Sequence, residues 1–301
     1  MSTRPRFGEV ITAMVTPFDP DGSLDIAAAR KMATYLIEHG SDGLVVCGTT
    51  GEAPTLTKAE KLKLFEAVLD AVGDKASVIA GTGTYDTAET IELTKEAGAL
   101  GAHACLIVTP YYSRPPQNGL LAHFSHIADE SSVPLMIYDI PGRTARRVER
   151  PTMLTLAKHE QIVAVKDAVG DPIETAKLRR ELDDSGSHDF EIYSGDDVLL
   201  MPHLSSGAVG IVSVCSHLIG PQIKQICSAW ADGKVDEAKS LYLRYLPLMS
   251  VIMGVTSSPI PVKYAVGLLG YPAGNARLPL VPPTEDEAGA IRKALEDAGL
   301  L

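Results

Sequence analysis

The sequence contains little cysteine and no long apolar run. Its four cysteines, Cys47, Cys105, Cys215 and Cys227, lack the spacing of a metal site or a disulfide framework, as is typical of a protein in a reducing compartment. No apolar stretch is long enough to span a bilayer, and no secretory signal is recognisable. These absences predict a cytoplasmic protein without a membrane partner.

Positive charge is also scarce. The 301 residues include 27 Lys and Arg against 38 Asp and Glu, which gives a net charge of −11. This balance argues against nucleic acid or an anionic membrane as a partner. The composition, 45% hydrophobic and 22% charged, is that of a globular protein. An anionic substrate would therefore have to be held by local positive charge.

What the sequence does contain is an alternation of short apolar runs with amphipathic segments. The runs are typical of strands buried on both faces of a parallel sheet. The predicted strands are Val10–Val15, Gly43–Cys47, Ser77–Gly81, His103–Val108, Pro134–Tyr138, Ile162–Lys166, Phe190–Ser194 and Ala208–Ser213. Helical periodicity separates them, as in Ile26–His39, Lys58–Val72, Asp86–Ala99 and Gly119–Glu130. Eight such units in about 230 residues predict an α/β protein with a (βα)8 TIM barrel.

A doubly wound open sheet is the alternative fold, but its dinucleotide fingerprint is missing. Gly81-Thr82-Gly83-Thr84 has the wrong spacing and is interpreted as a turn. From about residue 232 no further strand is predicted, and Lys234–Met253, Pro261–Leu269 and Glu285–Ala298 look helical. The expected organisation is a catalytic barrel at 1–231 followed by a C-terminal helical domain at 232–301.

Lys166 is out of place at the end of an apolar strand. A lysine withdrawn from water loses affinity for its proton, so its amine can act as a nucleophile at neutral pH. Taken alone, Lys166 is more simply explained as a side chain that reaches water past the strand end. The neighbouring strand ends change that interpretation.

In a barrel, chemistry occurs at the carboxyl ends of the strands. Four of those ends carry polar motifs: Gly48-Thr49-Thr50-Gly51-Glu52, Thr109-Pro110-Tyr111-Tyr112, Tyr138 to Arg143, and Ser194-Gly195-Asp196-Asp197. Each motif alone could be a capped turn, an aromatic rim or a solvated charge. Together with Lys166 they supply a nucleophile, proton-transferring hydroxyls and a guanidinium for a carboxylate. The set predicts a site that forms a Schiff base with a small oxo acid.

Other chemistries have less support. His123 and His126 have ligand-like spacing but lie in a helical stretch without a carboxylate beside them, so a packing or surface role is expected and no metal is predicted. Asp196 and Asp197 would repel a phosphate where barrels often bind one. No Gly-x-Ser-x-Gly motif supports a serine hydrolase.

Three motifs carry a family resemblance. The segments 48–52, 138–143 and Lys166-Asp167-Ala168 resemble the dihydrodipicolinate synthase / N-acetylneuraminate lyase family of class I aldolases, and the similarity extends to 108–112 and 260–263. Arg143 and the Tyr111-Tyr112 pair resemble the members that condense pyruvate with (S)-aspartate 4-semialdehyde in the diaminopimelate branch of lysine biosynthesis. The resemblance therefore implies a lyase of that kind.

The resemblance also implies a role for each motif residue. Lys166 would form the imine with pyruvate, and Tyr138 would be the acid/base hydroxyl beside it. Thr49 would connect Tyr138 to Tyr112 of a neighbouring subunit in a proton relay. The substrate-binding residues would be Thr50 for the pyruvate carboxylate, Arg143 for the semialdehyde carboxylate, and Gly195 and Ile211 as lining. The covalent imine would replace any cofactor, and the expected assembly is a homo-oligomer, typically a tetramer built as a dimer of dimers.

Two departures from the family pattern concern catalysis and regulation. Asp167 and Asp139 stand where many relatives carry Glu and Asn, although the actinobacterial type shares both residues, and little effect is expected. In lysine-inhibited relatives a pocket at the dimer interface uses His and Asn, where this chain has Lys58 and Tyr85 beside a retained Glu89. A lysine ligand would meet like charge and bulk there. Feedback inhibition by lysine is therefore predicted to be weak or absent.

Two other functions remain open from the sequence. One is an aldolase of the same family acting on a sialic acid or a 2-keto-3-deoxy sugar acid. The presence of Arg143 argues against this function. The other is a non-catalytic barrel that binds oxo acids, which would leave Lys166, Tyr138, Tyr112 and Thr49 without a purpose.

Overall fold

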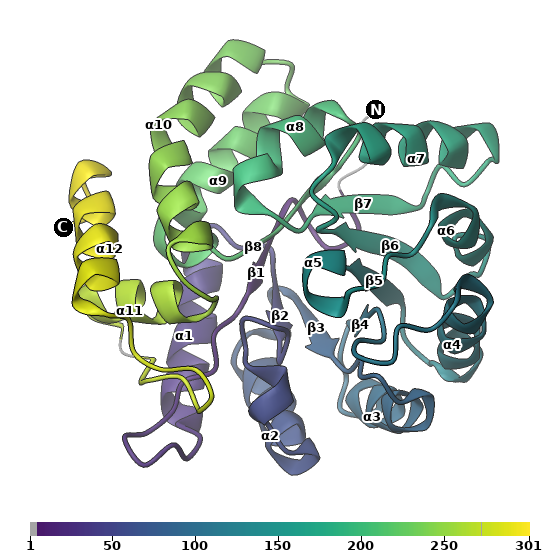
Figure 1. Cartoon of the computed structure of the whole chain (residues 1–301), viewed down its shortest axis with the longest axis horizontal. Coiled ribbons are helices and arrows are strands. Elements are labelled where there is room, and N and C mark those ends of the chain that lie inside the picture. The colour runs from purple at the N-terminus through teal and green to yellow at the C-terminus, as the bar shows by residue number, and fades with distance from the viewer. Residues whose placement is uncertain (1–4, 272) are drawn as a thin grey trace.

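Eight parallel strands form a closed barrel at the centre of the molecule, each paired with its neighbours in chain order (Figure 1). The computed structural model describes residues 5–271 and 273–301. The strands are β1 (Val10–Ala13), β2 (Gly43–Val46), β3 (Ser77–Gly81), β4 (Ala104–Val108), β5 (Leu135–Asp139), β6 (Ile162–Asp167), β7 (Glu191–Ser194) and β8 (Gly210–Ser213). The predicted (βα)8 barrel is confirmed, and the open sheet is excluded.

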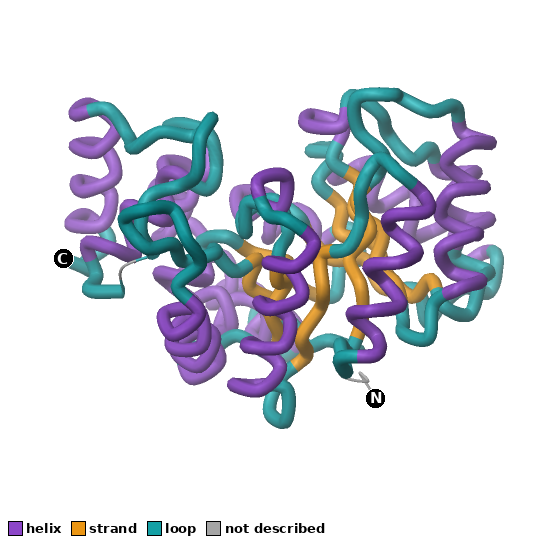
Figure 2. The backbone as a smooth tube through the Cα atoms, turned by 90° about the horizontal axis from the view of Figure 1, so that it is seen from below, coloured by secondary structure: helices purple, strands orange, loops and turns teal. Residues whose placement is uncertain are grey.

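Helices surround the barrel on its outer side (Figure 2). Between the strands lie α1 (Ile26–Glu38), α2 (Lys58–Val72), α3 (Thr87–Ala99), α4 (Gln117–Glu130), α5 (Pro141–Thr144), α6 (Arg150–Leu156), α7 (Pro172–Asp184) and α8 (Leu200–Ser205), with single turns η1 (Ala53–Thr55) and η2 (Asp197–Leu199). Several starts follow from capping chemistry. At α2, the Thr57 side chain accepts from the Glu60 amide and the Glu60 side chain accepts from the Thr57 amide, which satisfies two free donors.

Alternation along the strands divides their side chains between two cores. Ile11, Val45, Ile79, Met136 and Ala164 point into the barrel and fill its interior. The intervening residues pack outward against the helices in a second, larger cluster. Both faces are apolar because helices cover the outer one, which explains the continuous apolar runs in the sequence.

After the barrel the chain is helical, as predicted. It continues with α9 (Ser216–Ala231), α10 (Val235–Gly254), α11 (Ile260–Leu268) and α12 (Glu285–Asp297). The last three lie to one side of the barrel, at the left of Figure 1, where α10 packs on α9 and α12. The division into domains at 1–231 and 232–301 stays a prediction.

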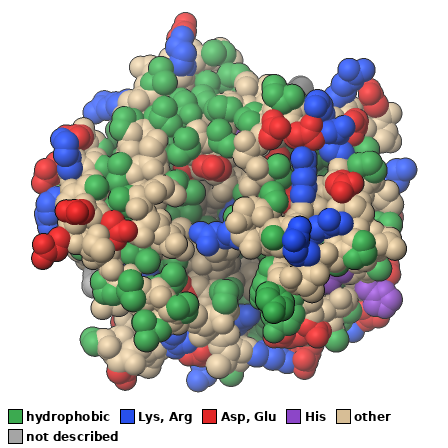
Figure 3. Space-filling model, in the orientation of Figure 1, with side chains coloured by type: hydrophobic (Ala, Val, Ile, Leu, Met, Phe, Trp, Pro, Cys, Tyr) green, Lys and Arg blue, Asp and Glu red, His purple; other side chains and the backbone are tan. Residues whose placement is uncertain are grey.

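The distribution of charge on the surface and the polarity of the helices fit the composition of the sequence. Charges of both signs are interspersed over the face in Figure 3, so the acidic excess does not form one block there. Among the described residues, no helix is both long and apolar enough to cross a membrane.

Candidate active site

Lys166 and Tyr138 lie side by side inside the barrel. They are paired in register on β6 and β5, and the Lys166 Nζ is 4.2 Å from the centre of the Tyr138 ring. Lys166 is only 5% exposed and Tyr138 4%. A lysine that reaches bulk water past the strand end is therefore ruled out.

The buried setting changes the protonation chemistry of Lys166. Burial lowers the pKa of its ammonium to about 8, the Asp197 carboxylate opposes this shift, and the Arg143 guanidinium adds to it. Asp197 is itself buried and accepts hydrogen bonds from the Val214 amide (2.9 Å) and the Cys215 amide (3.2 Å). The arrangement leaves a useful fraction of Lys166 as the neutral amine near neutral pH.

Tyr138 is held as a protonated phenol that contacts Thr49. Burial raises the pKa of Tyr138 to about 12, against the lowering effects of Arg143 and of a hydrogen bond with the Thr49 side chain. The backbone of Tyr138 is fixed as well, since Thr109 donates to its carbonyl from the amide (2.9 Å) and from the hydroxyl (3.0 Å). A fixed hydroxyl that contacts a second hydroxyl is suited to pass protons.

The turn from Gly48 to Glu52 closes tightly after β2. The Glu52 amide donates to the Thr49 carbonyl at 3.0 Å, and Thr50 within the turn is 4% exposed. Gly51 permits this closure, because a Cβ there would lie 3.1 Å from the Cα of Cys47 and from the Met14 carbonyl oxygen. Such turns present backbone amides that can bind a carboxylate.

A cavity of about 230 Å³ opens beside these groups. Thr49, Tyr138 and Arg143 line it, together with Tyr111 from the loop after β4. No acidic side chain is among its lining residues in the described chain. The local positive charge that an anionic substrate requires is thus present, in a protein whose net charge is −11.

Lys61 is a second cation of this cavity that the sequence reasoning missed. It is 7% exposed, and its amide donates to the Thr57 carbonyl at 3.0 Å, while its side chain lines the cavity. The signal was in the helical spacing: Lys61 shares one face of α2 with the buried Leu64, Phe65 and Val68. A lysine on the apolar face of a helix points to a site.

The other predicted site residues, Lys166 and Thr50 included, are not among the residues that line this cavity. Gly195 lies where strand ends approach closely, because a Cβ there would be 2.8 Å from that of Ala168. The Ile211 side chain packs in the outer cluster, so only its backbone can face the barrel mouth. Tyr112 is 94% exposed, with φ at +69°. Tyr111 packs edge-on against Tyr85, with ring centres 5.2 Å apart.

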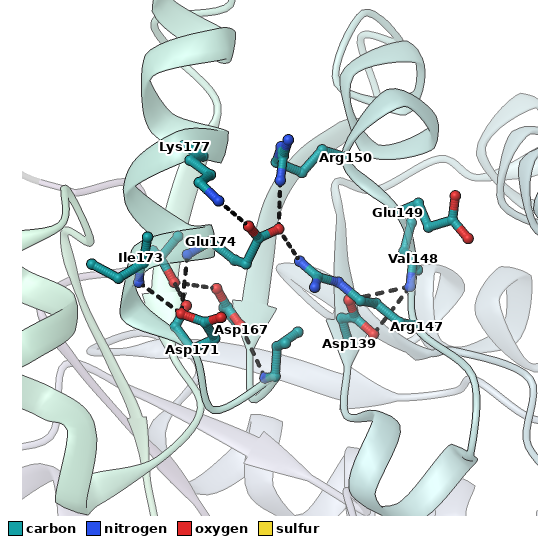
Figure 4. A network of polar contacts seen from close by, with 12 residues as sticks. Asp139, Arg147, Val148, Glu149, Arg150, Asp167, Asp171, Ile173, Glu174 and Lys177 are labelled. Atoms are coloured by element: carbon teal, nitrogen blue, oxygen red, sulfur yellow. Dashed lines mark hydrogen bonds and ion pairs between the residues drawn. The ribbon is translucent and has the colours of Figure 1, made fainter.

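Two carboxylates lie on the outer side of the barrel next to Lys166 and Tyr138. Asp139 and Asp167 follow Tyr138 and Lys166 in their strands and therefore point outward (Figure 4). Both Asp139 oxygens accept from the Val148 amide at 3.2 Å, which anchors the end of the loop that carries Arg143. The Asp167 carboxylate accepts from the Thr175 hydroxyl at 2.6 Å. Burial raises the pKa of Asp139 to about 7, and the nearby Asp167 contributes to this shift.

The histidines and acids do not assemble into a metal centre. No group of three or more His, Cys, Asp or Glu residues in the described parts of the chain could hold an ion. His123 is buried, with its Nδ1 2.9 Å from the Thr87 hydroxyl and its ring against Phe124. Its position is that of a packing residue.

Comparison with known proteins gives one consistent assignment. Residues 6–298 match the Dihydrodipicolinate synthetase family. The 4-hydroxy-tetrahydrodipicolinate synthase of Moorella thermoacetica is 48% identical over 98% of this chain and 100% of the relative. The crystal structure of DHDPS from Cyanidioschyzon merolae with lysine bound has a TM-score of 0.95 and 43% identity, covering 99% of this chain and 100% of the other.

A further solved structure contains a small oxo acid. The chloride-inhibited dihydrodipicolinate synthase from Acinetobacter baumannii, complexed with pyruvate, has a TM-score of 0.94 and 36% identity over 98% of this chain and 100% of that one. The family match, the fold and the near-complete coverage agree. The chain belongs to the Dihydrodipicolinate synthetase family.

Proposed function

We propose that this chain is a lyase that condenses pyruvate with (S)-aspartate 4-semialdehyde to give 4-hydroxy-tetrahydrodipicolinate, in the diaminopimelate route to lysine. The observation that carries the proposal is the buried Lys166 amine beside the Tyr138 hydroxyl, in a chain whose relatives are 4-hydroxy-tetrahydrodipicolinate synthases. The pyruvate bound by the related enzyme from Acinetobacter baumannii supports the first substrate.

In the first half of the reaction Lys166 activates pyruvate. The neutral amine attacks C2 of pyruvate, the carbinolamine loses water, and an imine forms. Tyr138 donates the proton that lets the oxygen leave and receives protons back through Thr49. Thr50 and the amides of the 48–52 turn hold the pyruvate carboxylate. Loss of a proton from C3 then gives the enamine, so the lysine itself takes the place of a cofactor.

In the second half the enamine carbon adds to the aldehyde of the semialdehyde, whose oxygen takes up a proton. The amino group of the semialdehyde then attacks the imine carbon, closes the ring and expels Lys166. Arg143 pairs with the semialdehyde carboxylate, for which a planar guanidinium can supply two parallel hydrogen bonds. Gly195 and the Ile211 backbone complete the wall of the site. One water leaves over the whole sequence.

Tyr112 completes the proton relay of a neighbouring subunit in this proposal. Its side chain is 94% exposed in the single chain, which fits a residue that acts on another copy. The working unit would be at least a dimer, and a tetramer built as a dimer of dimers is the expected form.

The decisive test is turnover of the two substrates, coupled to a dihydrodipicolinate reductase and followed by loss of NADPH. We expect robust turnover that disappears in Lys166→Ala. A wild-type protein that forms a pyruvate imine but does not turn over would point instead to another aldehyde, such as a sugar-acid precursor. Failure to form any imine would favour the non-catalytic oxo-acid-binding barrel.

A further inference from the structure

A fully buried ion pair joins the turn of the active site to the C-terminal helical region. Glu52, the last residue of the turn, has a side chain that is 0% exposed, and the Lys263 side chain on α11 is 3% exposed. The Lys263 Nζ donates to Glu52 Oε1 at 2.8 Å. Glu52 Oε2 accepts from the Arg277 amide, also at 2.8 Å. Both carboxylate oxygens of Glu52 are thus bound by residues far along the chain.

A second connection reaches the same turn through Thr16. Lys263 also donates to the Thr16 carbonyl at 2.9 Å, and the Thr16 hydroxyl donates to the Gly51 carbonyl at 2.7 Å. Lys263 therefore acts on Glu52 directly and on Gly51 through one intermediate. Neither contact involves the barrel interior or Lys166.

The backbone of the turn needs this support. Glu52 has φ of +58°, in the left-handed region that residues other than glycine rarely occupy. Such a conformation persists only where the surroundings fix it. Here the fixing groups are Lys263, the Arg277 amide and the Thr16–Gly51 hydrogen bond.

We infer that α11 and Arg277 form a positioning element of the active site, with Lys263 and Glu52 as positioning residues for the turn that binds the pyruvate carboxylate. The inference rests on the proposed function, because it assigns the turn to that carboxylate. Neither residue needs to touch the substrate. The positioning effect of Lys263 and Glu52 is confined to the pyruvate half of the site. The semialdehyde half depends on Arg143, which is carried by a different loop.

The test is a double variant, Glu52→Gln with Lys263→Met. Changing one partner would leave a buried charge alone, whereas changing both leaves a neutral pair of similar size, which folds commonly tolerate. The readout is the pyruvate concentration that half-saturates borohydride-trapped adduct formation. We expect it to rise about tenfold, because a displacement of about 1 Å in a binding group has effects of that order or larger. The KM for the semialdehyde should stay within about twofold of the wild-type value.

A control is Asp42→Asn with Lys224→Met, to which Glu9→Gln is added because Lys224 also pairs with Glu9 at 3.0 Å. The pair of Asp42 and Lys224, 2.6 Å apart, lies at the opposite end of the barrel and should leave the half-saturating concentration unchanged. Thr16→Val removes the Gly51 hydrogen bond without stranding a charge, so it tests the inference even if the double variant folds poorly. Unchanged half-saturation in a folded double variant, or in Thr16→Val, would overturn the inference. Absence of any adduct in the wild type would instead overturn the proposed function.

Discussion

Lys166 and Tyr138 are register partners on neighbouring strands, with the amine of one 4.2 Å from the ring centre of the other. Because this contact is buried, the amine carries less positive charge at neutral pH than an exposed lysine. The Lys166 amine and the Tyr138 hydroxyl are thus fixed by the same pair of strands.

The first prediction concerns the pH dependence of adduct formation. The pKa of Lys166 is lowered from 10.5 to about 8, so the rate of borohydride-trapped adduct formation should rise with pH and level off above about 8. Arg143→Leu should move the midpoint upward, because it removes a positive charge that lowers this pKa. Lys166→Ala should give no adduct at any pH, whereas Lys224→Ala should behave as wild type. A midpoint near 10.5 would contradict the argument.

Tyr138→Phe should separate proton transfer from packing. The ring remains to bury Lys166, but the hydroxyl that contacts Thr49 is lost, and kcat should fall by about 10²- to 10³-fold. Steady-state kinetics with both substrates measures the effect. Tyr193→Phe is the matched control, since this buried tyrosine of the same barrel bonds to Glu191 instead. Equal kcat losses in the two variants would show that general disturbance is the cause.

Arg143→Lys should weaken the second substrate selectively. The positive charge is kept, so the pKa of Lys166 and the half-saturation by pyruvate should change little. The two-bond geometry for the semialdehyde carboxylate is lost, and KM for the semialdehyde should rise about tenfold. Arg150→Lys, in the outer network with Glu174, should change neither value. A selective effect on pyruvate would assign Arg143 to the other carboxylate.

L-Lysine should neither inhibit the protein nor raise its melting temperature. The Lys58 ammonium is bound to Glu92 at 2.7 Å and Glu96 at 3.0 Å, and an ammonium cannot accept a hydrogen bond from a cationic ligand. Tyr85, which packs edge-on against Tyr111, adds bulk to the predicted ligand position. The enzyme from Cyanidioschyzon merolae, crystallised with lysine, is the positive control. Loss of turnover on adding lysine to this protein would disprove the prediction.

Asp139 should make stability depend on pH near neutrality. Its pKa is raised from 3.8 to about 7 in the folded protein, so the native state binds more protons than the unfolded chain between these values. The contribution of Asp139 to stability is therefore lost as pH rises from about 4 to 7. Asp139→Asn should melt higher relative to wild type at pH 8 than at pH 5, by a few degrees in calorimetry. A constant difference between the two proteins would refute this.

The barrel could be predicted from local signals, and the same signals single out Lys166 as the candidate nucleophile. Apolar runs bounded by turn residues define strands of a parallel sheet, and a lysine at the end of such a run is conspicuous. The orientation of Ile211 could not be predicted, because a strand buried on both faces shows no alternation that tells inside from outside. Lys166 and Tyr138 escape this ambiguity because they are polar.

The contacts that fix the active-site turn were beyond the sequence for a different reason. Glu52 and Lys263 are separated by 211 positions, and each looks like an ordinary charged residue in its own segment. The sequence indicates Asp197 only as a group that would repel phosphate, whereas in the fold its buried carboxylate raises the pKa of Lys166 against the effect of burial. Contacts of this kind form only when barrel closure brings segments that are distant in sequence together.

Barrel closure has a consequence for when the chain becomes active during synthesis. β1 pairs with β8, with Val10 beside Ile211, so the ring cannot close until β8 has been synthesised. Until then a nascent chain exposes two unpaired strand edges, and the pocket around Lys166 is open to water. The ribosome must release still more of the chain before Lys263 can reach Glu52. The pocket around Lys166 and the support of the 48–52 turn are therefore among the last features to form.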